Sequence, residues 1–223
     1  MMFGWPADST LLFIAAAYLA LCYLAICGRP GRGWLKTIIK TTSVALLALI
    51  AFQLSSMMLL VVALLACAIG DFFLSRNGTE EFVSAVGAFS FGHLSYAALF
   101  LLHPSADLQR VSDGWPLVIA LFLVGAIMLY VLFLKAGPLR WAALFYVPVV
   151  VAMGILATVL PPVGAIALVL PAALLFVFSD FILAQEMFVL PEDHKLRKVT
   201  PYVIWSSYWI AQALFLISFT VVL

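Results

Sequence analysis

The chain has 223 residues, of which 66% are hydrophobic and 9% are charged, and its formal net charge is +1. A soluble domain carries about 25% charged residues, so this composition excludes an ordinary soluble enzyme. A membrane-spanning helix needs about 20 residues, and about eight such helices with short connections would use the whole chain. The sequence therefore predicts a single all-α transmembrane domain over residues 1–223, with no separate catalytic domain.

Eight apolar segments follow one another along the chain, and residues that favour turns separate them. They cover about residues 9–27, 35–52, 56–74, 81–102, 115–134, 139–160, 163–188 and 200–222. The second and third segments are separated only by Gln53-Leu54-Ser55, so the helix count depends most on this pair. The pattern predicts a polytopic membrane protein with eight transmembrane helices.

The basic residues indicate how these helices are oriented. Of the eleven lysines and arginines, only Arg110 lies in an even-numbered connection. The others lie in or next to the odd-numbered connections: Arg29, Arg32, Lys36, Lys40, Arg76, Lys135, Arg140, Lys195, Arg197 and Lys198. Cytoplasmic loops are enriched in basic residues, so we expect the odd-numbered connections in the cytoplasm and both termini outside. In a bacterium, the chain would lie in the inner membrane.

The cysteines and the N-terminal residues indicate neither a disulfide or zinc site nor a cleaved signal peptide. Cys22, Cys27 and Cys67 lie in apolar segments without a Cys-x-x-Cys motif, so we expect buried thiols with no disulfide or zinc site. The N-terminal residues lack a positive region, so the first apolar segment is expected to be a retained span and not a cleaved signal peptide. No basic run or nucleic-acid motif is present, and no nucleic-acid partner is expected.

Two short segments of the chain resemble each other, namely residues 70–74 (GDFFL) and 179–183 (SDFIL). Each is followed by an apolar segment in which an aromatic residue lies four positions before a polar one, His93 in the first case and Gln212 in the second. The corresponding helices run in the same direction in the predicted topology. This pattern predicts a 4+4 parallel repeat about an axis along the membrane normal.

Polar residues inside the predicted spans indicate a functional site. An Asp or Lys at the centre of a membrane helix costs on the order of 2.5–3.5 kcal/mol, so such residues usually face a partner or a polar cavity. The candidates are Lys40, Asp71, His93, Tyr96, Asp180, Tyr208 and Gln212. At a rise of about 1.5 Å per residue, all of them lie in the cytoplasmic half of the membrane or near its middle. We therefore expect one shared cavity that opens toward the cytoplasmic leaflet.

Each of these residues also has a structural interpretation. Lys40 could extend its side chain to the membrane interface, and Asp71 could pair with Lys40 or cap the turn that follows it. His93 could be a hydrogen-bonded packing residue. Asp180 has no neighbour of opposite charge on its own helix, so a purely structural role is less well supported. The charged residues between positions 186 and 198 are expected to form a solvated loop, whose basic residues could attract lipid phosphate.

The chain resembles the YhhN family of lysoplasmalogenase-like membrane proteins through an ordered set of short motifs: Gly70-Asp71, Gly87, Phe91-Gly92-His93-Leu94-Ser95-Tyr96, Phe178-Ser179-Asp180, Leu183-Ala184, Tyr208-Trp209 and Ala211-Gln212. Lys40 is similar to a lysine early in the family's second helix, although Thr41 and Thr42 follow it where family members often have proline. The resemblance covers nearly the whole chain. It implies hydrolysis of the 1-alkenyl ether bond of lysoplasmalogens to a fatty aldehyde and glycerophosphoethanolamine or glycerophosphocholine.

Vinyl ether hydrolysis begins with protonation of the carbon β to oxygen, and water then adds to the oxocarbenium ion. It needs a carboxylic acid that is still protonated near neutral pH, a nearby negative charge and a positioned water. We assign Asp180 as the acid and Asp71, nearer Lys40, as the base and charge stabiliser, and the reverse assignment stays open. His93, a third catalytic candidate, Tyr208 and Gln212 would orient water or the glycerol hydroxyl, and Tyr96 is a further substrate-binding candidate. Lys40 would bind the phosphate.

No metal or cofactor is expected, because no serine-elbow, His-rich or Cys-rich pattern is present. The expected partners are a lysolipid substrate and the membrane lipids, and nothing in the sequence indicates an oligomeric state.

The alternative function is a small proton-coupled transporter, which would also contain buried carboxylates and kinking prolines such as Pro148 and Pro171. A carrier needs access from both sides, and the outer halves of the helices contain few ionisable groups, which favours the enzyme. A structural scaffold would not explain two buried carboxylates.

Overall fold

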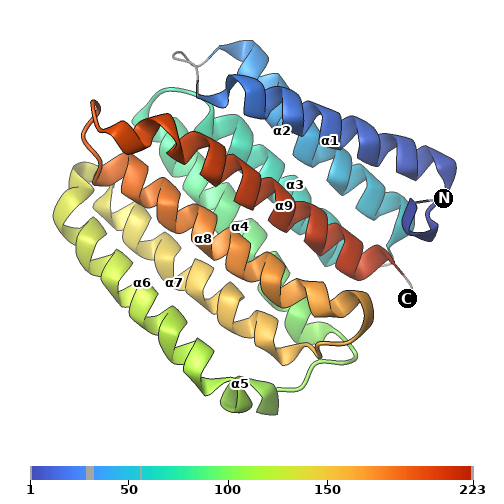
Figure 1. Ribbon diagram of the computed structural model, residues 1–223. Helices are drawn as coiled ribbons and strands as arrows, with labels where there is room; N and C mark the ends of the chain where they lie inside the picture. Colours follow the sequence, from blue (N-terminus) through green and yellow to red (C-terminus); the bar gives the residue numbers. More distant parts are fainter. Residues whose placement is uncertain (1, 29–32, 56, 222–223) are drawn as a thin grey trace.

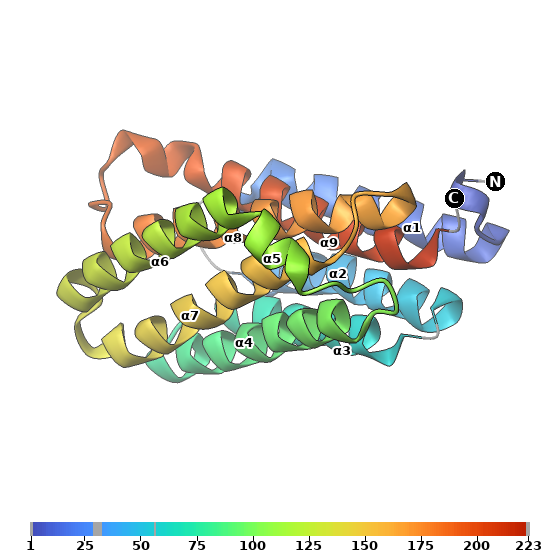
Figure 2. The same cartoon turned by 90° about the horizontal axis from the view of Figure 1, so that it is seen from below.

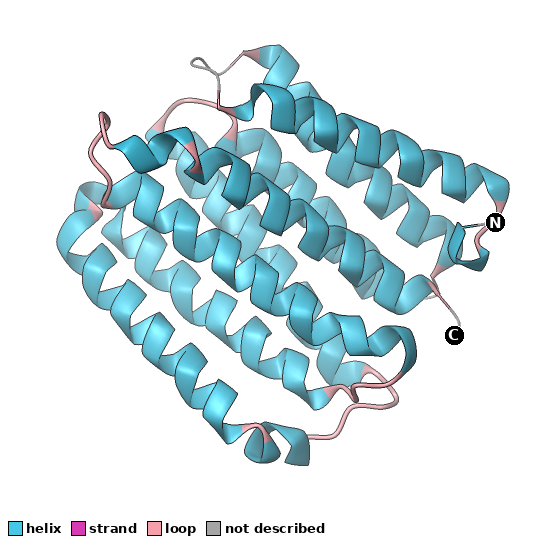
Figure 3. Ribbon diagram, viewed as in Figure 1, coloured by secondary structure: helices cyan, strands magenta, loops and turns pink. Residues whose placement is uncertain are grey.

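The computed structural model describes residues 2–28, 33–55 and 57–221, and these residues form eight long helices (Figure 1). The long helices are α1 (Ala7–Cys27), α2 (Trp34–Leu54), α3 (Met58–Leu74), α4 (Thr79–Leu102), α6 (Trp115–Lys135), α7 (Arg140–Leu156), α8 (Val169–Phe188) and α9 (Thr200–Thr220). The shorter elements are α5 (Gln109–Asp113) and the 3-10 helices η1 (Met2–Gly4), η2 (Gly137–Leu139), η3 (Ala157–Val159), η4 (Gly164–Leu168) and η5 (Lys195–Lys198). All of these elements are helical (Figure 3), so the all-α prediction is confirmed.

Seven of the described helices are long and apolar enough to cross a membrane. The remaining long helix, α3, is apolar but has only 17 residues. At about 1.5 Å per residue it measures roughly 26 Å, which is at the lower limit for a span. These helices support an integral membrane protein, while the count of eight spans and the side on which the termini lie stay predictions.

The helices form two layers, which Figure 2 shows one above the other. One layer contains α1, α9, α8 and α6 in that order, and the other contains α2, α3, α4 and α7. Consecutive long helices run in opposite directions, so the chain begins and ends at the same end of the bundle (Figure 1). The helices α1, α3, α6 and α8 end at the opposite end of the bundle. The helices that carry the two similar segments pack as the pairs α3–α4 and α8–α9, although the predicted 4+4 repeat is not tested by this packing.

The outer helices expose large apolar side chains that only a hydrocarbon environment accommodates. On α1 these include Leu11 and Leu21, and on α6 they include Phe122 and Ile127, each more than half exposed. Apolar patches of this extent on a soluble monomer would promote association. In a bilayer they contact lipid tails, which is consistent with α1 and α6 being the least buried of the long helices.

Some of the observed elements differ from the predicted segments. The segment expected as one helix over 139–160 is α7 followed by the 3-10 turn η3, and Pro148 lies inside α7. The short helix α5 was not predicted, because its five residues are too few for a hydrophobic period. Arg29 and Arg32 of the first connection, and the predicted boundaries at 56 and 222, lie outside the described residues.

Gly92 allows α3 and α4 to pack closely. A Cβ atom at this position would lie 2.8 Å from the Cys67 sulfur and 3.2 Å from the backbone oxygen of Ala63. Small residues have this role in membrane bundles, where close backbone approach contributes to helix association. The contact holds in register the two helices that carry Asp71 and His93.

Replacing Gly92 by Ala is expected to lower the free energy of unfolding by about 1–3 kcal/mol, because the added methyl group overlaps Cys67 and approaches the α3 backbone. Gly87→Ala is the matched control, since Gly87 lies on the same helix and a Cβ atom at this position would have no neighbouring atom within 4 Å. Thermal unfolding of both variants in one detergent measures the difference. Equal stability of the two variants would contradict the tight α3–α4 contact.

Candidate functional site

A polar cavity of about 290 Å³ lies between the two helix layers. Its lining includes residues at helix ends, among them Cys27 of α1, Ser75 after α3 and Glu186 near the end of α8. The mouth of the cavity therefore lies at the end of the bundle that holds the basic connections. Lys40, Asp71, Asp180 and Tyr208 line its deeper part. The lining also includes the polar side chains of Lys36, Ser179 and Tyr23.

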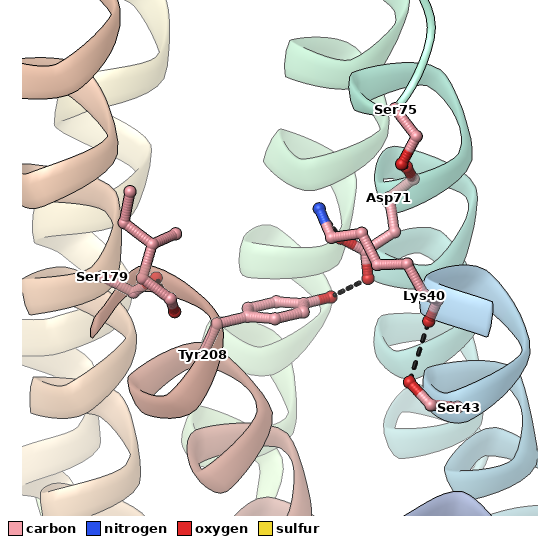
Figure 4. Close-up of polar contacts among 7 residues, drawn as sticks. Lys40, Ser43, Asp71, Ser75, Ser179 and Tyr208 are labelled. Atoms are coloured by element: carbon pink, nitrogen blue, oxygen red, sulfur yellow. Dashed lines mark hydrogen bonds and ion pairs between the residues drawn. The ribbon is translucent and has the colours of Figure 1, made fainter. Parts of the chain in front are cut away.

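Lys40 and Asp71 form an ion pair inside this cavity. The Lys40 Nζ atom lies 2.8 Å from Asp71 Oδ1, and the side chains are 12% and 1% exposed. The Tyr208 hydroxyl donates to Asp71 Oδ2 at 2.7 Å, so α2, α3 and α9 meet at one carboxylate (Figure 4). The Asp71 carboxylate is thus surrounded by a cation and a hydroxyl donor, which favour its ionised form.

Local packing holds this group in position. A Cβ atom at Gly70 would lie 2.7 Å from the Phe89 ring, so glycine at this position lets the ring pack beside Asp71. The Ser75 hydroxyl donates to the backbone oxygen of Asp71 at 2.7 Å, and the Ser43 hydroxyl donates to that of Lys40 at 2.8 Å (Figure 4). Both serines bond to backbone oxygens of the pair and do not contact its charged groups.

Two aromatic rings lie near the Lys40 ammonium group. Its Nζ atom is 6.0 Å from the centre of the Tyr23 ring and 5.9 Å from that of the Trp205 ring. The Trp205 indole donates to the backbone oxygen of Ala20 at 2.9 Å, which joins α9 to α1. Ring faces attract cations within about 6 Å. One interpretation of the sequence was that the Lys40 side chain extends to the membrane interface. The structure instead places its ammonium group between Asp71 and these two rings.

A second polar cluster contains Asp180, His93 and Tyr146. The Tyr146 hydroxyl donates to Asp180 Oδ2 at 2.9 Å, and His93 Nε2 lies 3.2 Å from the same oxygen and 2.8 Å from the Tyr146 oxygen. His93 is fully buried and Asp180 is 7% exposed. The Phe176 ring packs 4.4 Å from the imidazole, centre to centre. This cluster joins α4 and α7 of one layer to α8 of the other.

Asp180 lies between two cavities of different character. It lines the polar cavity, and it also lines an apolar cavity of about 50 Å³ between α4, α6, α7 and α8. Among the residues that line the apolar cavity are Ala143, Met128 and Phe82. An amphipathic ligand could thus have its polar part beside Asp71 and its apolar part beyond Asp180.

The structure separates three of the predicted site residues, His93, Tyr96 and Gln212, from the lining of the polar cavity. Tyr96 and Gln212 are fully buried, do not line the polar cavity, and pair with each other through the Tyr96 hydroxyl and Gln212 Oε1 at 2.5 Å. Tyr96 also stacks on Phe215, with ring centres 4.2 Å apart, so these side chains form a packed layer below the cavity. Helical spacing correctly put them on the inward faces, but it did not distinguish the cavity from the packed layer below it.

Other expectations need correction. Asp180 has no partner of opposite charge on its own helix, as expected, but His93 of α4 lies 3.2 Å from its Oδ2 atom. Cys22 and Cys27 are only half-buried, unlike Cys67, because α1 is an outer helix. Glu186 belongs to α8 and lines the cavity mouth, and so is not part of a solvated loop.

Tyr146 was not among the predicted site residues. Its only sequence signal is a hydroxyl in an apolar segment two positions before Pro148. Periodicity alone could not show that it faces Asp180. Among residues 2–28, 33–55 and 57–221, no group of three or more His, Cys, Asp or Glu side chains could hold a metal ion.

Comparisons with known proteins give a consistent assignment. The family model described as the YhhN family matches residues 35–219. Proteins from Escherichia coli O6:H1, Escherichia coli O157:H7 and Shigella flexneri, each described as "Uncharacterized membrane protein YhhN", are 29% identical to the chain over 160 residues. The matched region covers 68% of this chain and 74% of each relative. No solved structure matches the chain.

The Lys40→Met variant is expected to lose about 3 kcal/mol of unfolding free energy, because the Asp71 carboxylate would stay buried without its cation. Adding Asp71→Asn should recover part of this loss, since a neutral amide needs no counter-charge. Thermal unfolding in detergent compares the single and double variants with Lys195→Met, which removes an exposed lysine. If Lys40→Met is as stable as Lys195→Met, the buried ion pair does not stabilise the fold.

Proposed function

The chain belongs to the YhhN family, and from this premise we propose that it is an intramembrane hydrolase that cleaves the vinyl ether bond of lysoplasmalogens. The observation that carries the proposal is the position of Asp180, which lines both a polar and an apolar cavity. A vinyl ether bond lies at the boundary between the polar headgroup and the apolar chain of such a lipid. Asp180 therefore lies where the reactive bond of a bound lysolipid would be.

In the proposed reaction, Asp180 acts as the general acid. Its Oδ2 atom accepts from Tyr146 and lies within hydrogen-bonding distance of His93, which leaves Oδ1 to carry the proton toward the substrate. His93 can donate through Nε2, while its Nδ1 atom has no hydrogen-bond partner among the described residues. The same two donors stabilise the carboxylate that forms when the proton leaves.

Proton transfer from Asp180 to the carbon β to oxygen produces an oxocarbenium ion. Water then adds to the carbon attached to oxygen and loses a proton to a carboxylate. Collapse of the hemiacetal breaks the carbon–oxygen bond and yields the aldehyde and the glycerophospho alcohol. A general acid of this kind contributes typically about 10²–10⁴-fold to the rate.

Asp71 is suited to be the base in the second step. In the ligand-free protein its charge is balanced by Lys40 at 2.8 Å, which limits its basicity. Lys40 also lines the cavity, so a lipid phosphate could attract its ammonium group away from Asp71. The carboxylate would then gain basicity only when substrate is bound, with Tyr208 still holding its orientation through the 2.7 Å hydrogen bond.

The transporter alternative has weaker support. The polar cavity reaches Asp71 and Asp180, but below it the fully buried Tyr96, Phe100 and Phe215 rings pack together between α4 and α9. A carrier must open this layer to expose its site on the other side. A site accessible from one end is sufficient for a hydrolase whose substrate enters and whose products leave on the same side of the membrane.

Purified protein is expected to release aldehyde from 1-alkenyl lysophosphatidylethanolamine and not from the saturated 1-alkyl analogue. Asp180→Asn and Asp71→Asn should each lower the rate by about 10²-fold or more, because one removes the acid and the other the base. Glu192→Gln, which neutralises an exposed carboxylate at the same end of the bundle, is the matched control.

Each variant is first checked for an unfolding midpoint close to that of the wild-type protein. Full activity of both aspartate variants would exclude the proposed mechanism. If the wild-type protein releases no aldehyde in detergent or in nanodiscs, the hydrolase proposal is wrong, and proton-coupled flux in liposomes becomes the next measurement.

The apolar cavity leads to a second expectation. Ala143→Leu adds volume where a buried alanine of α7 lines this cavity, so KM for a long-chain alkenyl substrate should rise about tenfold. A short-chain substrate, which does not reach Ala143, should be affected little. Ala142→Leu, at the adjacent position outside both cavities, is the control, and an equal effect on both chain lengths would argue against a chain-binding role.

A further inference from the structure

Glu186 at the cavity mouth has a carboxylate whose bonding is incomplete. It lies on α8, two residues before the helix ends at Phe188, and it lines the polar cavity. Its Oε2 atom is buried and accepts no hydrogen bond from the described residues. Buried polar atoms in folded proteins are nearly always hydrogen-bonded, because an unpaired carboxylate oxygen retains most of its desolvation cost. The position therefore suits an external donor.

The nearby arginine does not supply that donor. The Arg197 side chain donates to the backbone oxygen of Glu186 at 2.5 Å, to that of Leu190 at 2.9 Å and to that of Pro191 at 2.9 Å. These bonds satisfy carbonyl groups at the end of α8 and in the turn that follows it. They fix the direction in which α8 ends, while the Glu186 carboxylate remains at the cavity surface.

The mouth of the cavity also contains positive charge. Lys36 of α2 lines the same cavity as Glu186, and its Nζ atom lies 3.5 Å from the backbone oxygen of Cys27. Lys40 lies deeper on the same helix. A ligand that enters from this end therefore meets the Glu186 carboxylate and the Lys36 ammonium group at the mouth, and the Lys40–Asp71 ion pair below them. A carboxylate and an ammonium group at the mouth complement a headgroup with one cationic and one anionic part.

We propose that Glu186 binds the primary ammonium group of a zwitterionic lysophospholipid while Lys36 and Lys40 face its phosphate, so that this site selects an amine headgroup. The inference rests on the proposed function, because it assigns headgroup selectivity to the same cavity. It makes Glu186 a specificity residue that contacts the substrate away from the reacting atoms.

The geometry favours a primary over a quaternary ammonium group. A primary ammonium has three N–H donors and can satisfy the unpaired Glu186 oxygen, whereas a trimethylammonium group has none. Quaternary groups are instead recognised by aromatic faces. The Tyr23 and Trp205 rings of this cavity already face the Lys40 ammonium at about 6 Å, so they do not form a free aromatic cage.

The experiment measures kcat/KM for three 1-alkenyl lysolipids, which carry phosphoethanolamine, phosphocholine or phosphate alone. Glu186→Gln is expected to lower kcat/KM for the ethanolamine lipid about tenfold through KM, since it removes a charge-assisted contact to the ammonium group. The phosphate lipid should be unaffected or improved. Glu192→Gln, an exposed carboxylate outside the cavity, should leave all three values unchanged.

Binding of the non-cleavable 1-alkyl ether forms of the three lipids separates this inference from the proposed hydrolysis. Weaker binding of the ethanolamine form alone by Glu186→Gln supports the headgroup role, even if the wild-type protein releases no aldehyde and the hydrolase proposal fails. An equal loss for all three headgroups, or no loss, overturns the role of Glu186, even if hydrolysis is observed.

Discussion

The buried ion pair between Lys40 and Asp71 is the constraint on which the rest of the site depends. A lone aspartate or lysine inside a membrane costs several kcal/mol, whereas a cation 2.8 Å from the carboxylate and a tyrosine hydroxyl at 2.7 Å offset that cost. These contacts require α2 and α3 of one layer to meet α9 of the other. Once the three helices meet, the space between them and α8 becomes the polar cavity.

The second carboxylate has different neighbours, and this difference is the basis of its proposed role. Asp71 lies beside a lysine, whereas Asp180 lies beside a histidine and a tyrosine, Tyr146, at the border of an apolar cavity. Two carboxylates in unlike environments can differ in protonation, which acid–base catalysis needs. The contacts also bridge the two helix layers, so the groups that make the chemistry possible also hold the bundle together.

Much of the fold could be predicted because hydropathy and turn residues are local signals. They located the long helices to within a few residues and identified Lys40, Asp71 and Asp180 as residues that need partners. They did not detect α5, and they did not indicate that α3 would be shorter than a typical span. Helix ends depend on the connections and on neighbouring helices, which a hydrophobic period does not describe.

The sequence by itself determined that the chain is helical, is built for a membrane, and carries charged groups in one half of its helices. The tertiary structure decided which of these groups share a cavity. Tyr96 and Gln212 bond to each other away from the polar cavity, while Tyr146 and Glu186 contact or line the site. The reason is physical: the rotation and depth of each helix follow from packing between distant segments. A local pattern contains no information about that packing.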